Sequence, residues 1–95
     1  MKEVTFVGTR CVLKFGTYPN GRVAIRLVSS DGPFGVATVN IPDAELAPNE
    51  VCIKSYSENE GMLDALVKAR VVAKPHRTVQ SGYVVIPVCK LLVRP

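Results

Sequence analysis

Alternating apolar and polar residues predict a β-strand near the start of the chain. Cys11, Leu13 and Phe15 fall on one face of an extended segment, and Val12 and Lys14 fall on the other. Alternation with a period of two is typical of a strand that buries one face in a core. We therefore expect the face with Phe15 to be buried and the face with Lys14 to be exposed.

A tight turn and a second strand follow. Pro19 restricts its own φ, and the Asn20-Gly21 pair accepts the positive φ that tight hairpin turns require. The next segment alternates again, so the two strands are expected to form an antiparallel hairpin. Val23, Ile25 and Leu27 are predicted to face the core, and Arg22, Ala24 and Arg26 are predicted to face solvent.

Four later segments are apolar and strand-sized. They cover residues 34–41, 51 to 54 or 55, 78–80 and 83–92, the last two providing one or two strands. The stretch 42–50 carries a proline near each end and is too polar for a regular element, so we interpret it as a connecting loop. Pro87 has no amide donor, so the final strand lies at a sheet edge or is broken there.

One helix is predicted from residue 58 to about residue 70. Ser57 and Glu60 match the capping-box pattern, in which each side chain bonds the backbone amide of the other residue. Gly61 lies inside this helix and costs it roughly 1 kcal/mol relative to alanine. Arg70 stands where glycine is expected to end a helix. The apolar stripe of the helix contains Met62, Leu63, Ala65, Leu66, Val67 and Ala69.

These elements predict an α+β fold with a single antiparallel β-sheet of about five to six strands and one α-helix packed on it. The sheet is expected to begin with an N-terminal meander. Sixteen valines and no tryptophan agree with a largely β-structure. A chain of 95 residues has room for one modest core, and no linker divides it, so we expect a single domain, 1–95.

The apolar segments are too short to be membrane spans or a signal peptide, and neither end carries a lipidation motif. We therefore expect no membrane association and a location in the cytoplasm of the cell that makes the protein. Cys11, Cys52 and Cys89 are widely spaced and lie among apolar neighbours, which is typical of buried thiols in a reducing compartment.

Candidate chemistry is sparse. His76 is the only histidine, lies between two cations and has no patterned partner, so it is interpreted as an exposed loop residue. The cysteine, histidine and carboxylate spacings match no zinc or calcium motif, and the glycines form no phosphate-binding loop. We therefore predict no enzymatic activity, no cofactor, no metal and no small-molecule substrate.

Charge is distributed unevenly along the chain. Net charge is +3 over residues 1–42, −5 over 43–64 and +6 over 65–95, which sums to the overall +4. The acidic segment is a candidate contact for a basic surface on a partner protein. Its candidate residues are Asp43, Glu45, Glu50 and Glu58.

The basic residues suggest a different surface. On an exposed strand face they could follow a phosphate backbone, or they could simply be solvated and protect a strand from edge pairing. Sheet surfaces that bind nucleic acids usually add aromatic platforms, and the aromatic residues here are scattered. The candidate nucleic-acid-binding residues are Lys14, Arg22, Arg26, Lys74 and Arg77.

The chain resembles a family of small uncharacterised proteins from bacteriophages, plasmids and other bacterial mobile elements. The resemblance covers nearly the whole length. It is carried by residues 20–25 (NGRVAI), 36–42 (VATVNIP), 56–63 (YSENEGML) and 78–89 (TVQSGYVVIPVC). The family has no assigned activity, so the resemblance carries over no catalytic or binding residue. Small non-enzymatic proteins of mobile elements often occupy a surface on a host machine, including restriction and CRISPR complexes.

We therefore expect a non-enzymatic protein-binding module, an anti-defence inhibitor or modulator of a host complex, as anti-CRISPR proteins are, that acts by steric and electrostatic occlusion. The alternative is a nucleic-acid-binding accessory protein that uses a basic sheet face. The high apolar fraction also suggests that some apolar surface is covered by a partner or by a second copy in a homodimer.

Overall fold

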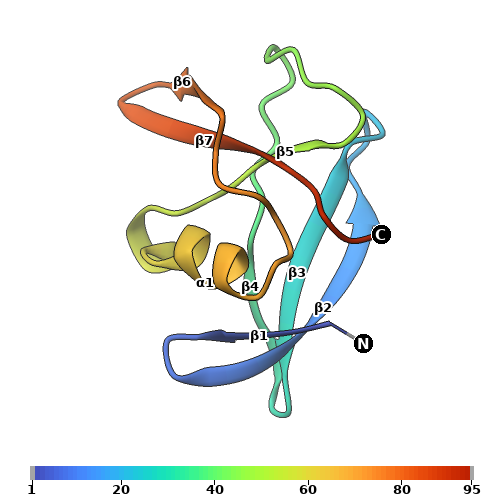
Figure 1. Ribbon diagram of the computed structural model, residues 1–95, viewed down its shortest axis with the longest axis vertical. Helices are drawn as coiled ribbons and strands as arrows, with labels where there is room; N and C mark the ends of the chain where they lie inside the picture. Colours follow the sequence, from blue (N-terminus) through green and yellow to red (C-terminus); the bar gives the residue numbers. More distant parts are fainter. Residues whose placement is uncertain (1, 95) are drawn as a thin grey trace.

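The computed structural model describes residues 2–94. In chain order the elements are β1 (Glu3–Phe6), β2 (Thr9–Thr17), β3 (Val23–Ser29), β4 (Gly32–Val36), β5 (Glu50–Cys52), the 3-10 turn η1 (Ser57–Asn59), α1 (Met62–Lys68), β6 (Arg77–Ser81) and β7 (Val84–Lys90). The α+β class is confirmed: the chain is mostly antiparallel sheet with one short α-helix (Figure 1). Within the described residues, no helix is both long and apolar enough to cross a membrane.

The strands form two sheets, whereas the sequence pattern predicted one. β1, β2, β3 and β4 form a four-stranded antiparallel meander, and β5, β7 and β6 form a three-stranded antiparallel sheet. The division arises because the strand predicted over 34–41 changes partners in its middle. It pairs with β3 up to Ala37, whose amide donates to the carbonyl of Ile25, and Thr38 then bridges to Ile53 beside β5.

The predicted β2–β3 hairpin is confirmed, and its turn has the expected chemistry. The amide of Gly21 donates to the carbonyl of Tyr18, and Gly21 then adopts a φ of 86°. A turn followed by a glycine in the left-handed region is a common three-residue hairpin connection. β1 was not predicted, because it has only four residues and is separated from β2 by a two-residue turn at Val7 and Gly8.

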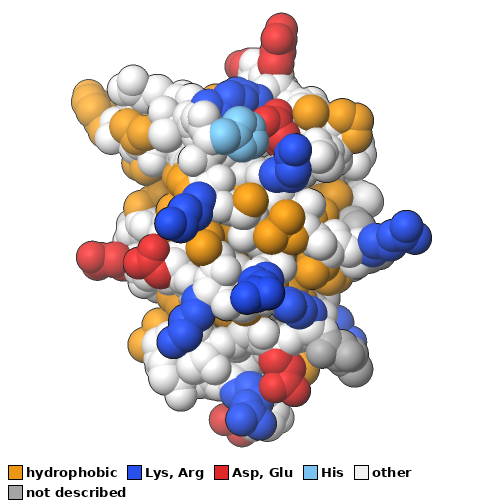
Figure 2. Space-filling model, in the orientation of Figure 1, with side chains coloured by type: hydrophobic (Ala, Val, Ile, Leu, Met, Phe, Trp, Pro, Cys, Tyr) orange, Lys and Arg blue, Asp and Glu red, His pale blue; other side chains and the backbone are white. Residues whose placement is uncertain are grey.

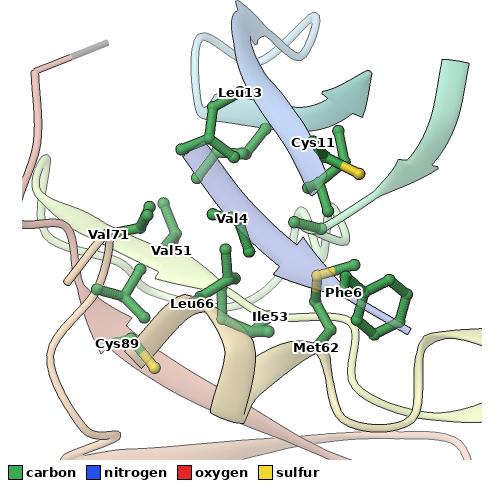
Figure 3. Close-up of a cluster of buried hydrophobic side chains, with 14 residues drawn as sticks. Val4, Phe6, Cys11, Leu13, Val51, Ile53, Met62, Leu66, Val71 and Cys89 are labelled. Carbon is green, nitrogen blue, oxygen red and sulfur yellow. The ribbon is translucent and has the colours of Figure 1, made fainter. Parts of the chain in front are cut away.

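The main core lies between α1 and both sheets. Met62 and Leu66 of α1 are fully buried, and Figure 3 shows them facing strands that belong to different sheets. Phe6 from β1 lies beside Met62 in this view, and Cys89 from β7 lies near Leu66. A smaller second core, built around Cys52, Ile86 and Val88, lies on the opposite face of the three-stranded sheet.

The start of the helix differs from the prediction. Ser57 and Glu60 do not form a capping box, because Ser57 begins a 3-10 turn with a φ of 54° and no side chain caps it. α1 starts only after Gly61, whose φ of 91° makes it a helix boundary and not an interior residue. The side chain of Ser55 accepts a hydrogen bond from the amide of Leu63 in the first turn.

The end of the helix is defined by Arg70. Its φ is 60°, its amide donates to the carbonyl of Val67, and the amide of Val71 donates to the carbonyl of Leu66. This pair of bonds is the Schellman motif, in which the left-handed residue is usually glycine. Leu66 and Val71 are both fully buried, which supplies the apolar contact that usually accompanies the motif.

Arg70→Gly is therefore expected to stabilise the fold. A non-glycine residue in the left-handed region costs about 1 kcal/mol, and glycine removes that cost. The melting temperature should rise by roughly 4 to 8 °C in a thermal unfolding experiment. Lys68→Gly is the matched control, because it places glycine inside the last turn of α1 and should lower the melting temperature. A lower melting temperature for Arg70→Gly would contradict this account of the helix end.

Candidate functional site

Of the four predicted acidic residues, Asp43, Glu45 and Glu50 lie in or at the end of one loop, and Glu58 lies in a different element. Asp43 and Glu45 are exposed in the loop between β4 and β5, whereas Glu58 lies in η1. The carboxylate of Glu58 accepts a hydrogen bond of 2.6 Å from the ammonium of Lys54, which lowers the pKa of Glu58. Within residues 2–94, Asp43 and Glu45 therefore form no ion pair, and Glu58 belongs to a separate one.

Glu50 is the centre of a group of side-chain contacts that closes the loop between β4 and β5. We call Glu50 and its partners Arg77, Ala47 and His76 the clasp. Its Oε1 accepts hydrogen bonds of 2.8 Å from the guanidinium of Arg77 and 2.9 Å from the amide of Ala47, and its Oε2 contacts Nε2 of His76. Arg77, Ala47 and His76 together lower the pKa of Glu50 to about 2. Figure 2 shows this single histidine beside a basic and an acidic side chain. The side chain of Glu50 is only 12% exposed, so its role is structural.

The predicted basic residues are also divided. Lys14 and Arg26 are exposed and directly opposite each other on β2 and β3. The guanidinium of Arg22 instead donates to the carbonyls of Ile41, at 2.6 Å, and Ala44. Arg22 therefore holds the loop after β4 in place, and its guanidinium does not join Lys14 and Arg26 in a common basic surface.

The remaining predicted cations lie elsewhere, and one exposure prediction on β3 was wrong. Arg77 is committed to Glu50 and also donates to the carbonyl of Glu45. Lys74 is exposed on the connection between α1 and β6, whereas Lys14 and Arg26 lie on β2 and β3. Ala24 was expected to face solvent, but it is only 6% exposed, on the strand that follows Arg22.

Lys14 and Arg26 border an apolar surface that the sequence interpretation missed. We define the outer sheet face as Val12, Lys14, Arg26, Val28 and Val36, on the side of the four-stranded sheet away from α1. Cross-strand partners share a face, so Val12 lies beside Val28, and Arg26 lies between Lys14 and Val36. Phe34 is the extra residue of a bulge at the β4 edge, and its ring packs against Phe6 of the main core. An open hollow of about 550 Å³ is lined by Lys14, Arg26, Val28 and Val36 of this face, together with Phe34.

A signal for this surface was present in the sequence. Val12 and Val28 each follow a buried apolar residue, so both faces of these strands carry apolar side chains. A strand whose solvent face is polar would show polar residues at these positions. Apolar residues at adjacent positions therefore indicate that the second face is also partly covered or available for contact.

A second positively charged surface comes from the C-terminal third of the chain. We define the basic face as Lys68, Arg70, Lys74, Lys90 and Arg94. The segment after α1 pairs with the end of β7, since Val72 bridges to Leu91 and the amide of Ala73 donates to the carbonyl of Lys90. Figure 2 shows Lys and Arg side chains spread over this side of the molecule, with acidic side chains near its margins. Within residues 2–94, the basic face takes part in no ion pair.

The three thiols are part of the packed interior. Cys11, Cys52 and Cys89 are free and buried, and burial raises the pKa of each, that of Cys89 to about 11. These thiols are therefore protonated at neutral pH and are packed as small apolar groups. In the part of the chain that the structure describes, no three histidine, cysteine or carboxylate side chains are grouped to hold a metal ion.

The clasp predicts a pH-dependent contribution of Glu50 to stability. Its folded pKa of about 2 lies below the ordinary value of 4.5, so the carboxylate stabilises the fold above about pH 4.5. This contribution disappears as the pH falls toward 2. Glu50→Gln should lower the urea midpoint at pH 7, and the difference from the unmodified protein should vanish near pH 2. Glu58→Gln, which breaks a more exposed pair, should have a smaller effect; an equal effect would argue against the clasp.

Searches against protein-family models, curated proteins and solved structures find no match to this chain. The resemblance to small proteins of mobile elements therefore remains a prediction from the segments that carry it. Glu50 and Arg22 are occupied in holding the loop, whereas the exposed cations of the outer sheet face and of the basic face take part in no ion pair within residues 2–94.

Proposed function

We propose that this chain is a binding module that engages a partner protein through the outer sheet face. The observation that carries the proposal is that apolar side chains are exposed beside two neighbouring cations, Lys14 and Arg26, which face each other across β2 and β3. Val36 is 41% exposed and is the cross-strand partner of Arg26, and Phe34 at the adjoining β4 edge is 39% exposed. A contiguous apolar surface with a charged border is typical of a site for another macromolecule.

The composition of the surface favours a protein over a nucleic acid. Its centre consists of the branched aliphatic residues Val12, Val28 and Val36, which fit apolar side chains. Nucleic-acid platforms on sheets use several aromatic rings to stack bases. None of the five residues of the outer sheet face is aromatic, and the ring of Phe34 at the β4 edge packs edge-on against Phe6 of the main core at a centroid distance of 6.3 Å.

The charges of the surface indicate the chemistry of the partner. Lys14 and Arg26 are both exposed, and Arg10 near the same face is paired with Glu3 at 3.6 Å. A complementary surface would present an apolar side chain flanked by carboxylates. Binding there would act by steric and electrostatic occlusion of the partner. The narrower proposal that the partner is a defence complex of a bacterial host is supported by the sequence resemblance alone.

The acidic loop is retained as a smaller part of the proposal. Asp43 and Glu45 are exposed and could contact a basic rim on the same partner. Glu50 and Glu58 are removed from this role because each is engaged within the chain.

A charge reversal on the outer sheet face should abolish binding. The Lys14→Glu/Arg26→Glu variant and the unmodified protein would each be immobilised and exposed to nuclease-treated bacterial lysate. The matched control is Lys74→Glu/Lys90→Glu, which changes the net charge equally on the basic face. A partner retained by the control and reduced about tenfold or more by the first variant supports the proposal. Equal retention by both variants would exclude the outer sheet face as the site.

A second candidate function is nucleic-acid binding through the basic face. The supporting observation is that its five cations form no ion pair with any carboxylate of residues 2–94. Such a group can follow a phosphate backbone without reading base sequence. Arg22 and Arg77 do not contribute, since both are bound to groups within the chain.

Salt dependence separates the two candidate functions. If the basic face binds nucleic acid, fluorescence anisotropy with a labelled oligonucleotide should show affinity that falls steeply with salt. Lys74→Ala/Lys90→Ala should reduce the slope of log K against log salt by roughly 0.7 to 0.9 for each phosphate that is no longer neutralised. Lys14→Ala/Arg26→Ala is then the control and should leave the slope unchanged. No anisotropy change at low salt would remove this candidate.

A further inference from the structure

The exposed edge of β6 differs from the other sheet edges. β1 carries Glu3, β4 carries Pro33, and both features discourage pairing with another strand. β5 is flanked by the chain near Thr38, which bridges to Ile53. Among the described strands, β6 pairs only with β7, and from Thr78 to Ser81 it contains neither a charge nor a proline. Arg77, at its start, is turned toward Glu50.

The register shows which backbone groups of β6 are open. Ser81 and Val84 flank a two-residue turn, in which Gly82 has a φ of 59°. Hydrogen-bonded and non-hydrogen-bonded pairs alternate from this turn, so the backbone groups of Thr78 and Gln80 point away from β7. Pro87 lies opposite Thr78 and has no amide to donate, which agrees with this alternation. Two N–H and two C=O groups are therefore available along this edge.

Exposed apolar side chains lie on the same hairpin. Tyr83 at its tip is fully exposed, Val85 is 59% exposed, and Val79 is half-buried beside the second core. Figure 2 shows apolar side chains at the end of this hairpin, at the upper left. The edge thus combines unpaired backbone groups with apolar side chains, which is the surface that strand addition requires.

We propose that β6 is a self-association edge, on which β6 of a second copy pairs antiparallel about a two-fold axis at Val79. Thr78 of each copy would then face Gln80 of the other, and the two pairs would exchange four backbone hydrogen bonds. Val79 would face its own counterpart, so the half-buried apolar surface beside the second core becomes continuous across the dimer. The two three-stranded sheets would form one six-stranded sheet.

A second copy fits this edge better than a foreign strand. The edge has no charged side chain that would select a partner of opposite charge, and the same open pattern is present on every copy. An isologous contact requires a surface that is complementary to itself, which two identical antiparallel strands provide. Although each chain has a net charge of +4, the nearest cation, Arg77, is paired with Glu50.

Cysteine trapping tests the register directly. In the proposed dimer only residue 79 faces itself, at a separation suitable for a disulfide. Under oxidised glutathione, Val79→Cys should give crosslinked dimer about tenfold faster or more than Ser81→Cys, whose position faces Arg77 of the second copy. The native thiols are buried and do not compete. Equal crosslinking rates for the two variants would overturn the proposal.

A backbone block provides the second test. Gln80→Pro removes an amide that points to the open edge and leaves the bonds to β7 in place. Introduced into the Val79→Cys variant, it should reduce the crosslinking rate to that of Ser81→Cys, whereas Gln80→Ala should not. Circular dichroism confirms that each variant is folded. Crosslinking that persists with Gln80→Pro would overturn the proposal, because it would show that the copies meet through another surface. The β6 edge would then be available to a strand of another protein.

Discussion

The backbone of residues 37–39 joins the two sheets, and the rest of the structure depends on this junction. Ala37 donates to Ile25 of β3, and its carbonyl accepts from the amide of Lys54 beyond β5. The hydroxyl of Thr38 accepts from the amide of Ile25 and shares a hydrogen bond of 2.8 Å with the hydroxyl of Tyr18. Ala37 is fully buried, so a larger side chain there would force the sheets apart.

The side chain of Asn59 extends this junction to the helix. Its amide nitrogen donates to the carbonyls of Val36, at 2.6 Å, and Lys54, at 3.0 Å, and the residue is 4% exposed. η1 is therefore fixed against both sheets, and α1 follows into the angle between them. This placement leaves the outer sheet face and the β6 edge uncovered in different sheets. The two proposed contacts share no residue, so a dimer could present two partner-binding faces at once.

The sequence pattern predicted local structure well wherever one periodicity dominated. Alternation placed Ile25 and Leu27 in the core, and the helical stripe containing Met62 and Leu66 is buried as expected. The capping-box prediction was wrong because the chain forms a 3-10 turn here, in which the buried amide of Asn59 reaches two backbone carbonyls. No local pattern distinguishes these outcomes, since the carbonyls belong to residues 5 and 23 positions earlier in the chain.

The candidate sites were harder to predict because charge along a chain does not determine charge on a surface. The acidic segment was a candidate contact for a basic surface on a partner, but Glu50 meets Arg77 across 27 positions and Arg22 reaches the carbonyl of Ala44 across 22. In these contacts the charged groups of Glu50, Arg77 and Arg22 are bound within the chain and hold the loop closed. The C-terminal third has no acidic residues of its own, so the cations of the basic face remain on the surface. The proposed contact surfaces are therefore those whose charged side chains make no ion pair or hydrogen bond within the described chain.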